Sequence, residues 1–349
     1  MRKTGHQDAG LRRRVGADDA RRSTRRRLLI ALGAGALLPA TSALAAEKTV
    51  HIGILSGGTH QIRSGLEDAL IQGLREQGYV EGRNLIVERR YAGTNFSVQA
   101  PEYARELAGM KLDAIVTTCS PSTLAAKYAT TSTPIVMAAV SDPVGHNIIA
   151  SLARPGQNIT GLSSQAEELL PKRLELLAAL VPKSTTVAVM MNANNTVHAL
   201  GWQKLEGAAQ QLKMKLMNIE VRNPDGIAAG METAARARAG ALLLMPDDPM
   251  FYNNRLRIIE LAARYRLPDF YWASDYVEAG GLMSYGENLR GAYRGAATYI
   301  DKIARGSNPA TLPVAQPTRF ELVVNQKTAK TLGITIPPST LVLADKVIE

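Results

Sequence analysis

Short apolar runs alternate with amphipathic helical patterns from about residue 49 onward, and this alternation predicts α/β units with parallel sheets. In the first half of the chain the predicted strands are residues 49–55, 84–90, 113–118 and 134–140. The helical patterns between and after them cover about 63–77, 98–110 and 122–130.

The same order of elements restarts near residue 168. Predicted strands lie at 185–191, 215–221, 241–245 and 269–271, with helices at about 168–180, 201–212, 227–237 and 253–265. Two similar halves, in a chain of 349 residues, predict two doubly wound lobes with a cleft between them. Ligands of open parallel sheets bind beyond the carboxyl ends of the strands, so the loops after strands are the places to search.

The first 45 residues have the order of a secretory signal peptide: a basic segment, an apolar run at 28–38, and Ala43-Leu44-Ala45. Eleven helical residues span about 16 Å, roughly half of a bilayer core, so we do not expect a transmembrane helix. The string TRRRLL at 24–29 resembles a twin-arginine signal, and the Sec route stays open. The single cysteine, Cys119, is far from the cleavage site, so the mature chain is expected to be soluble in the periplasm without a lipid anchor.

The formal net charge of +10 suggests nucleic acid, but its distribution argues against that partner. Residues 1–46 hold ten Lys/Arg and three acidic residues, a net of +7. The rest of the chain holds 31 basic and 28 acidic residues, a net of +3, which produces no strong field.

Two serines mark a strand-to-helix junction that is suited to anions. Ser120 and Ser122 flank Pro121 after an apolar strand, and the free amides of a helix N-terminus attract carboxylate or phosphate. The alternative is an ordinary helix cap without a ligand. Cys119, just before them, is expected to be a small buried side chain.

Two aspartates, Asp142 and Asp247, each follow an apolar strand, one in each half of the chain. Each is placed to receive an ammonium group across a cleft, and the alternative is turn chemistry in an Asp-Pro-type loop. Aromatic residues gather in the second half, where they would stack on a ligand or pack in the core: Phe251, Tyr252, Tyr271, Trp272 and Tyr276.

Catalytic and metal signatures are absent from the sequence. It contains no G-x-x-x-x-G-K-[ST], G-x-S-x-G or H-E-x-x-H string, and its five histidines show no metal-ligand spacing. We therefore expect no catalytic residue, no metal and no cofactor. An enzyme on a Rossmann-like scaffold, a sensor for a membrane receptor and a sugar-responsive repressor remain as alternatives, although the repressor would need a DNA-binding headpiece where the signal lies.

Seven strings together resemble the tryptophan/tyrosine-type substrate-binding proteins of ABC transporters. They are GYVEGRN at 78–84, SDPV at 141–144, SLARPGQNITG at 151–161, KRLELL at 172–177, EAGGLMSYG at 278–286, NQKTAK at 325–330 and IPPS at 336–339. The resemblance covers nearly all of residues 48–349. It implies a type I periplasmic-binding-protein fold, in which two lobes close around a small molecule and the closed form docks on a permease.

The resemblance also implies a domain division and a set of cleft residues. Lobe 1 would hold 46–163 plus 281–312 and lobe 2 would hold 164–280 plus 313–349, with crossings near Ser163, Gly281 and Pro313. The implied cleft residues are Ser56, Ser120, Ser122, Asp142, Thr160, Asn192, Asp247 and Asp275. We expect Ser120 and Ser122 to hold a carboxylate and the aspartates an amine, with an aromatic or other apolar amino acid as ligand, permease subunits as partners and a monomeric state.

Overall fold

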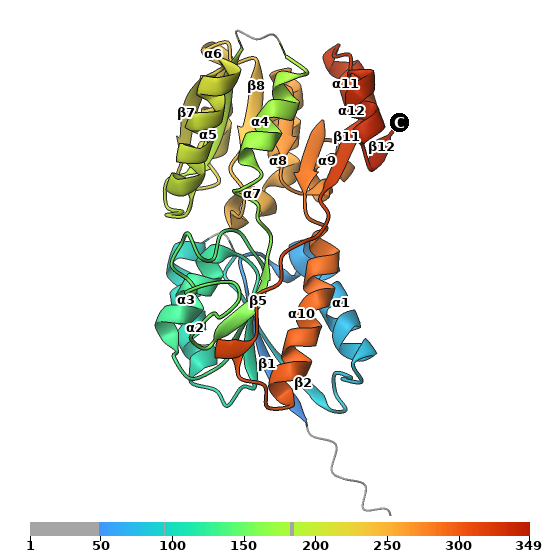
Figure 1. The fold of residues 1–349 in the computed structure, drawn as a ribbon. Helices are drawn as coiled ribbons and strands as arrows, with labels where there is room; N and C mark the ends of the chain where they lie inside the picture. Colours follow the sequence, from blue (N-terminus) through green and yellow to red (C-terminus); the bar gives the residue numbers. More distant parts are fainter. Residues whose placement is uncertain (1–48, 94, 182–184) are drawn as a thin grey trace, which may run out of the picture. The chain divides into compact units, whose positions relative to one another are not determined.

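The computed structural model describes residues 49–93, 95–181 and 185–349. The predicted signal peptide at 1–45 lies outside the described residues. Residues 48–349 form one unit, and Figure 1 shows it as two α/β lobes.

The first sheet has five parallel strands in the order β2-β1-β3-β4-β5. They are β1 (Val50–Ser56), β2 (Leu85–Tyr91), β3 (Ala114–Thr117), β4 (Ile135–Val140) and β5 (Ile159–Ser163). The helices α2 (Phe96–Ala108) and α3 (Ser120–Ala129) cover one face, and α1 (His60–Glu76) and α10 (Leu289–Ala304) cover the other (Figure 1). Every residue of β4 is buried, as expected for a strand covered on both faces.

The second sheet has seven strands in the order β12-β11-β10-β9-β8-β6-β7. They are β6 (Thr186–Asn192), β7 (Lys215–Val221), β8 (Ala241–Leu244), β9 (Asp269–Tyr271), β10 (Met283–Gly286), β11 (Glu321–Asn325) and β12 (Lys346–Ile348). Only the β10–β11 pair is antiparallel among them. The helices of this lobe are α4 (Leu170–Ala178), α5 (His198–Leu212), α6 (Gly226–Arg236), α7 (Pro249–Asn253), α8 (Arg255–Arg264), α9 (Ser274–Glu278), α11 (Gln326–Leu332) and α12 (Pro338–Leu343). The predicted fold class, two doubly wound lobes, is confirmed.

Three segments carry the chain between the sheets, and two of them differ from the prediction. The first joins β5 to α4. The second leaves after Gly286 rather than near Gly281, because β10 pairs with β9 and β11 in the second sheet. The third follows Ala315 rather than Pro313, because Ala315 still exchanges backbone hydrogen bonds with β5.

One short helix was not predicted. The pattern at 253–265 predicted the helix that forms as α8, and the chain adds α7 before it. Asp248 ends the preceding loop and accepts a hydrogen bond from the amide of Phe251, which caps α7. The short helix α7 therefore begins at Pro249, directly after the Asp247–Asp248 pair.

Gly161 of β5 has no room for a side chain. Its φ is +129°, and an added Cβ would lie 2.2 Å from the carbonyl oxygen of Met137 in β4. Gly161→Ala is therefore expected to lower the free energy of unfolding by about 2–4 kcal/mol, measured by urea denaturation. Gly207→Ala is the matched control: Gly207 is exposed in α5 with no atom within 4 Å of an added Cβ, and it should gain about 0.5–1 kcal/mol. Equal stability of the two variants would contradict this assignment.

Candidate ligand site between the lobes

A small cavity, lined by both charged and apolar side chains, lies where loops after strands of both sheets meet. Its volume is about 40 Å³, which is room for a few water molecules rather than for a whole solute. The lining residues are Thr118, Cys119, Ala139, Leu289 and Tyr293 from the first lobe and its edge, and Ser164, Ala166, Arg173, Asp247, Asp248, Pro249, Tyr252, Trp272 and Glu287 from the second lobe and the crossing segments.

Arg173 of α4 is the most unusual side chain of this cavity. It is fully buried, and it donates from Nε to the carbonyl of Tyr285 (2.7 Å) and from Nη1 to the carbonyl of Ala166 (2.6 Å). Its Nη2 has no hydrogen-bond partner, and no carboxylate of the described chain lies within ion-pair distance. Burial lowers the pKa of Arg173 to about 9, which shows how strongly the site disfavours an uncompensated cation. An anionic group of a ligand would supply the missing counter-charge.

Glu287 supplies a carboxyl group to the same cavity from the segment between β10 and α10. It is 8% exposed, and its Oε2 has no hydrogen-bond partner within the described part of the chain. Burial, and to a lesser degree the charge of Asp247, raises the pKa of Glu287 to about 8. A cationic group placed beside Glu287 would favour its ionised form.

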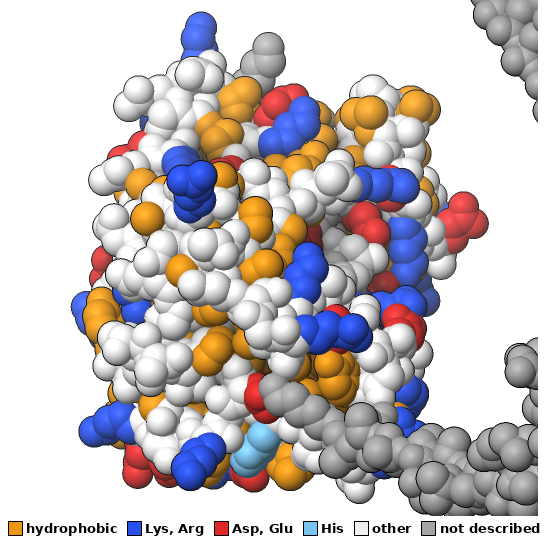
Figure 2. Space-filling view, turned by 60° about the horizontal axis from the view of Figure 1, so that its bottom comes forward, with side chains coloured by type: hydrophobic (Ala, Val, Ile, Leu, Met, Phe, Trp, Pro, Cys, Tyr) orange, Lys and Arg blue, Asp and Glu red, His pale blue; other side chains and the backbone are white. Residues whose placement is uncertain are grey.

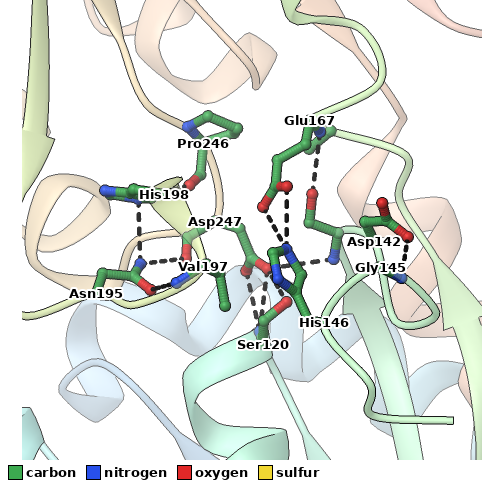
Figure 3. A network of polar contacts seen from close by, with 12 residues as sticks. Ser120, Asp142, Gly145, His146, Glu167, Asn195, Val197, His198, Pro246 and Asp247 are labelled. Atoms are coloured by element: carbon green, nitrogen blue, oxygen red, sulfur yellow. Dashed lines mark hydrogen bonds and ion pairs between the residues drawn. The ribbon is translucent and has the colours of Figure 1, made fainter. Parts of the chain in front are cut away.

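Asp247 lies in the loop between β8 and α7 and reaches across to the first lobe (Figure 3). Its carboxylate accepts hydrogen bonds from the amide of Ser120 at 3.1 and 3.2 Å, from the amide of Ser141 at 3.2 Å and from the hydroxyl of Ser120. Burial still raises the pKa of Asp247 to about 7, although these donors act in the opposite direction. The amino end of α3, which we expected to hold a ligand carboxylate, therefore holds Asp247 here.

Three other predicted residues lie outside the cavity lining. The hydroxyl of Ser122 accepts hydrogen bonds from the amides of Thr118 and Cys119, both at 3.1 Å, and so caps its own helix. Thr160 of β5 donates to the carbonyl of Leu312 at 2.8 Å. Ser56 ends β1, is buried, and its hydroxyl has no hydrogen-bond partner in the described chain.

The two remaining predicted acids have partners of their own. Asp142 accepts from the amide of Gly145 at 2.8 Å and from Nζ of Lys204 at 3.2 Å, a contact between the lobes. Asp275 accepts at 3.0 Å from the hydroxyl of Tyr252, whose ring lines the cavity. Asp275 therefore does not line the cavity; it hydrogen-bonds to Tyr252, which does.

Asn192 belongs to a neighbouring hollow of about 320 Å³ that shares Asp248 and Pro249 with the cavity. Its side-chain amide donates to Asp248 at 3.0 Å. Residues from both lobes line this hollow, with Phe96, Pro121 and Leu124 on the first lobe. Of the eight predicted cleft residues, Asp247 lines the cavity and Asn192 lines the hollow beside it, and the other six line neither.

The aromatic residues of the second half divide in the same way. Tyr252 and Trp272 line the cavity, whereas Phe251, Tyr271 and Tyr276 are buried behind it. The rings of Tyr271 and Tyr276 stack with centroids 4.4 Å apart, and Trp272 packs on Tyr276 at 4.8 Å. Stacking in the core fixes the two rings that face the cavity.

Sequence analysis missed Arg173 and Glu287. A signal for Arg173 was present, because Leu170, Arg173, Leu174 and Leu177 follow the apolar spacing of an amphipathic helix, so the arginine had to point inward. Glu287 had no comparable signal, because it follows a four-residue strand that the pattern alone did not predict.

Gly57, in the loop after β1, forms a close contact between the lobes. An added Cβ would lie 2.4 Å from Cβ of Pro249, and the carbonyl of Gly57 accepts from the side-chain amide of Asn253 at 2.7 Å. Gly57→Ala should hinder closure and weaken solute binding roughly 10- to 100-fold, measured by titration calorimetry, because overpacking costs about 1–3 kcal/mol. Its unfolding midpoint should stay close to that of the wild type, and unchanged affinity would show that the contact plays no part in closure.

None of the helices in the described part of the chain is long and apolar enough to cross a bilayer, and no three potential ligand side chains in it are grouped to hold a metal ion. On the face drawn in Figure 2, lysine and arginine side chains are dispersed among acidic and apolar ones.

Two α/β lobes with a cavity at the carboxyl ends of their strands define a type I periplasmic-binding-protein architecture. The chain belongs to the ABC transporter substrate-binding protein family, whose sequence profile matches residues 51–348. The predicted family and its solute-binding role are thereby confirmed.

Three relatives illustrate this membership. A tyrosine-binding protein of Clostridioides difficile (strain R20291) is 26% identical over 292 residues, which is 82% of each chain. A conserved domain protein from Vibrio cholerae is 28% identical with a TM-score of 0.79, and an ABC domain from Streptococcus pneumoniae, solved in complex with L-Trp, is 24% identical with a TM-score of 0.78. Each of these structures covers 86% of this chain and is itself covered completely.

Proposed function

We propose that this protein binds a zwitterionic α-amino acid between its lobes and delivers it to the permease of an ABC importer. The observation that carries the proposal is that one cavity is lined by a buried basic side chain and a buried acidic side chain, each with an atom that has no hydrogen-bond partner in the described chain. Nη2 of Arg173 lacks an acceptor and Oε2 of Glu287 lacks a donor. In this proposal the α-carboxylate binds Arg173 and the ammonium group binds Glu287.

Aromatic amino acids are the first candidates for this solute. Tyr252 and Trp272 line the cavity, and rings of this kind pack favourably against another aromatic side chain. The tyrosine-binding relative and the relative solved with L-Trp point in the same direction. The adjoining hollow, with an apolar side formed by Phe96, Pro121 and Leu124, adds space into which a side chain would extend.

The wider role follows from the same proposal. The protein would be exported by its N-terminal segment, act as a soluble monomer in the periplasm, and bind and release its solute without turnover. Closure of the lobes would present the surface that the permease recognises. No cofactor enters this scheme.

A thermal-shift panel of amino acids tests the proposal. The protein is first unfolded and refolded to remove any solute it carried through purification. A ligand at 100 times its dissociation constant adds about 2.7 kcal/mol, which should raise the melting temperature by a few degrees. A shift with tryptophan, tyrosine or phenylalanine supports the proposal. Absence of a shift with every amino acid, together with a shift for a sugar or nucleoside, would refute it.

A further inference from the structure

A lysine of the second lobe lies between two carboxylates, one from each lobe. Nζ of Lys204, in α5, is 3.2 Å from Oδ2 of Asp142, in the loop after β4 of the first lobe. The same Nζ is 4.0 Å from Oε1 of Glu168, which directly precedes α4. Because α4 packs against α5, Glu168 and Lys204 belong to the same lobe. The lysine therefore has one acidic partner across the junction of the lobes and one on its own side.

The loop 141–147 packs closely against α5 at this point. Oδ1 of Asp142 accepts a hydrogen bond from the amide of Gly145 at 2.8 Å, which orients the carboxylate (Figure 3). A Cβ added to Gly145 would lie 2.8 Å from Cδ2 of Leu200, which precedes Lys204 on α5. The side chains of Lys204 and Asp142 are 27% and 18% exposed. Solvent therefore screens this pair less than it screens an ion pair on the open surface.

Glu168 is the less favourable partner while the lobes are in contact. Burial raises the pKa of Glu168, and the charge of Lys204 acts against this shift. The charges of Asp142 and Glu167 act in the same direction as burial. Two carboxylates therefore compete for one ammonium group, and the proximity of Asp142 disfavours the ionised form of Glu168.

We propose that Lys204 sets solute affinity without touching the solute, by exchanging Glu168 for Asp142 when the lobes close. None of these three side chains lines the cavity or the hollow beside it. A contact made only in the closed arrangement favours closure, so the affinity for every solute held there rises by the same factor. Glu168 has the opposite effect, because it keeps a partner for the ammonium group when the lobes are apart. The proposal rests on solute binding between the lobes, but it applies to a solute of any class.

Titration calorimetry on variants of the full chain tests the exchange, with the two solutes that give the largest thermal shifts. Lys204→Met and Asp142→Asn should each weaken binding roughly two- to fivefold, and the double variant no more than either one. Asparagine keeps the Oδ1 acceptor for the amide of Gly145. Lys204→Arg keeps the charge and should bind as the wild type does.

Glu168→Gln is the variant with the opposite expected sign. It should strengthen binding roughly two- to threefold, because it removes the partner that Lys204 has in the open arrangement and the carboxylate that repels Asp142. Glu168→Gln should lose this gain when it is combined with Lys204→Met. Far-UV circular dichroism confirms that all variants are folded before their affinities are compared.

Two further measurements separate closure from a direct solute contact. Lys204→Met should weaken both solutes by the same factor. That factor should shrink as potassium chloride is raised from about 0.05 M to about 0.5 M, because salt screens partly exposed charges.

The outcomes keep this proposal apart from the proposed ligand class. Opposite changes of affinity in Lys204→Met and Glu168→Gln support the exchange, whichever solute binds. A change of the same sign in both variants, or no change in either, overturns it. A loss confined to one solute also overturns it and makes Lys204 a contact of that solute. Failure of every amino acid to bind refutes the ligand class alone, because the comparison is then made with the sugar or nucleoside that does bind.

Discussion

Replacement of Arg173 by methionine is expected to weaken amino-acid binding roughly a hundredfold or more. Methionine keeps an unbranched apolar stem in the core but removes the guanidinium whose Nη2 has no protein partner. Loss of one member of a buried charge pair costs about 2–5 kcal/mol, and each 1.4 kcal/mol is tenfold in affinity. Titration calorimetry with the amino acid that gives the largest thermal shift measures the change.

A thermodynamic cycle that combines Arg173→Met with a ligand lacking its carboxylate distinguishes loss of carboxylate binding from damage to the fold. Arg173 also donates to the carbonyls of Ala166 and Tyr285, so its loss removes two structural hydrogen bonds. The amine formed by removing the carboxylate from the same ligand should bind the wild type weakly, and Arg173→Met should weaken it little further. If the variant weakens the amine and the amino acid by equal factors, Arg173 does not bind the carboxylate.

The architecture was predictable because its signals are local. Buried strands such as β4 show as apolar runs, and helices between them show as amphipathic patterns, so both lobes appear in the sequence. The errors fell where local signals are weak. The four-residue strand β10 was not predicted, so the second crossing was placed too early in the chain. The five-residue helix α7, which precedes the predicted helix, was also missed.

The site was only partly predictable because its contacts are long-range. Asp247 and Ser120 both follow strands, and their side chains are in contact. This contact joins residues 127 apart in the sequence. Sequence analysis therefore assigned both the amino end of α3 and Asp247 to ligand contacts, although they contact each other. The direction of Asp247 depends on a left-handed backbone, which residue type permits but does not specify.

The second large effect is a rise of affinity with pH. With the lobes closed and no ligand charge beside it, burial raises the pKa of Glu287 to about 8, so its carboxyl group holds a proton at neutral pH. A bound ammonium group favours the carboxylate and lowers this pKa, so binding releases a proton wherever the pH lies between the lowered value and 8. In that window affinity should rise up to tenfold per pH unit, or by roughly a hundredfold from pH 6 to pH 8. Above pH 8 the dependence should level off until the ligand's own amine loses its proton.

Calorimetry at several pH values, in buffers of different ionisation enthalpy, measures both the affinity and the proton released. Glu287→Gln cannot titrate, so its affinity should change little with pH, and its deficit against the wild type should be largest near pH 8. Burial raises the pKa of Asp247 to about 7, but its donors from Ser120 and Ser141 are not the proposed ligand contacts, so it should contribute little to the slope. An affinity that falls from pH 6 to pH 8, or a slope that survives in Glu287→Gln, would show that Glu287 is not the group that receives the ammonium.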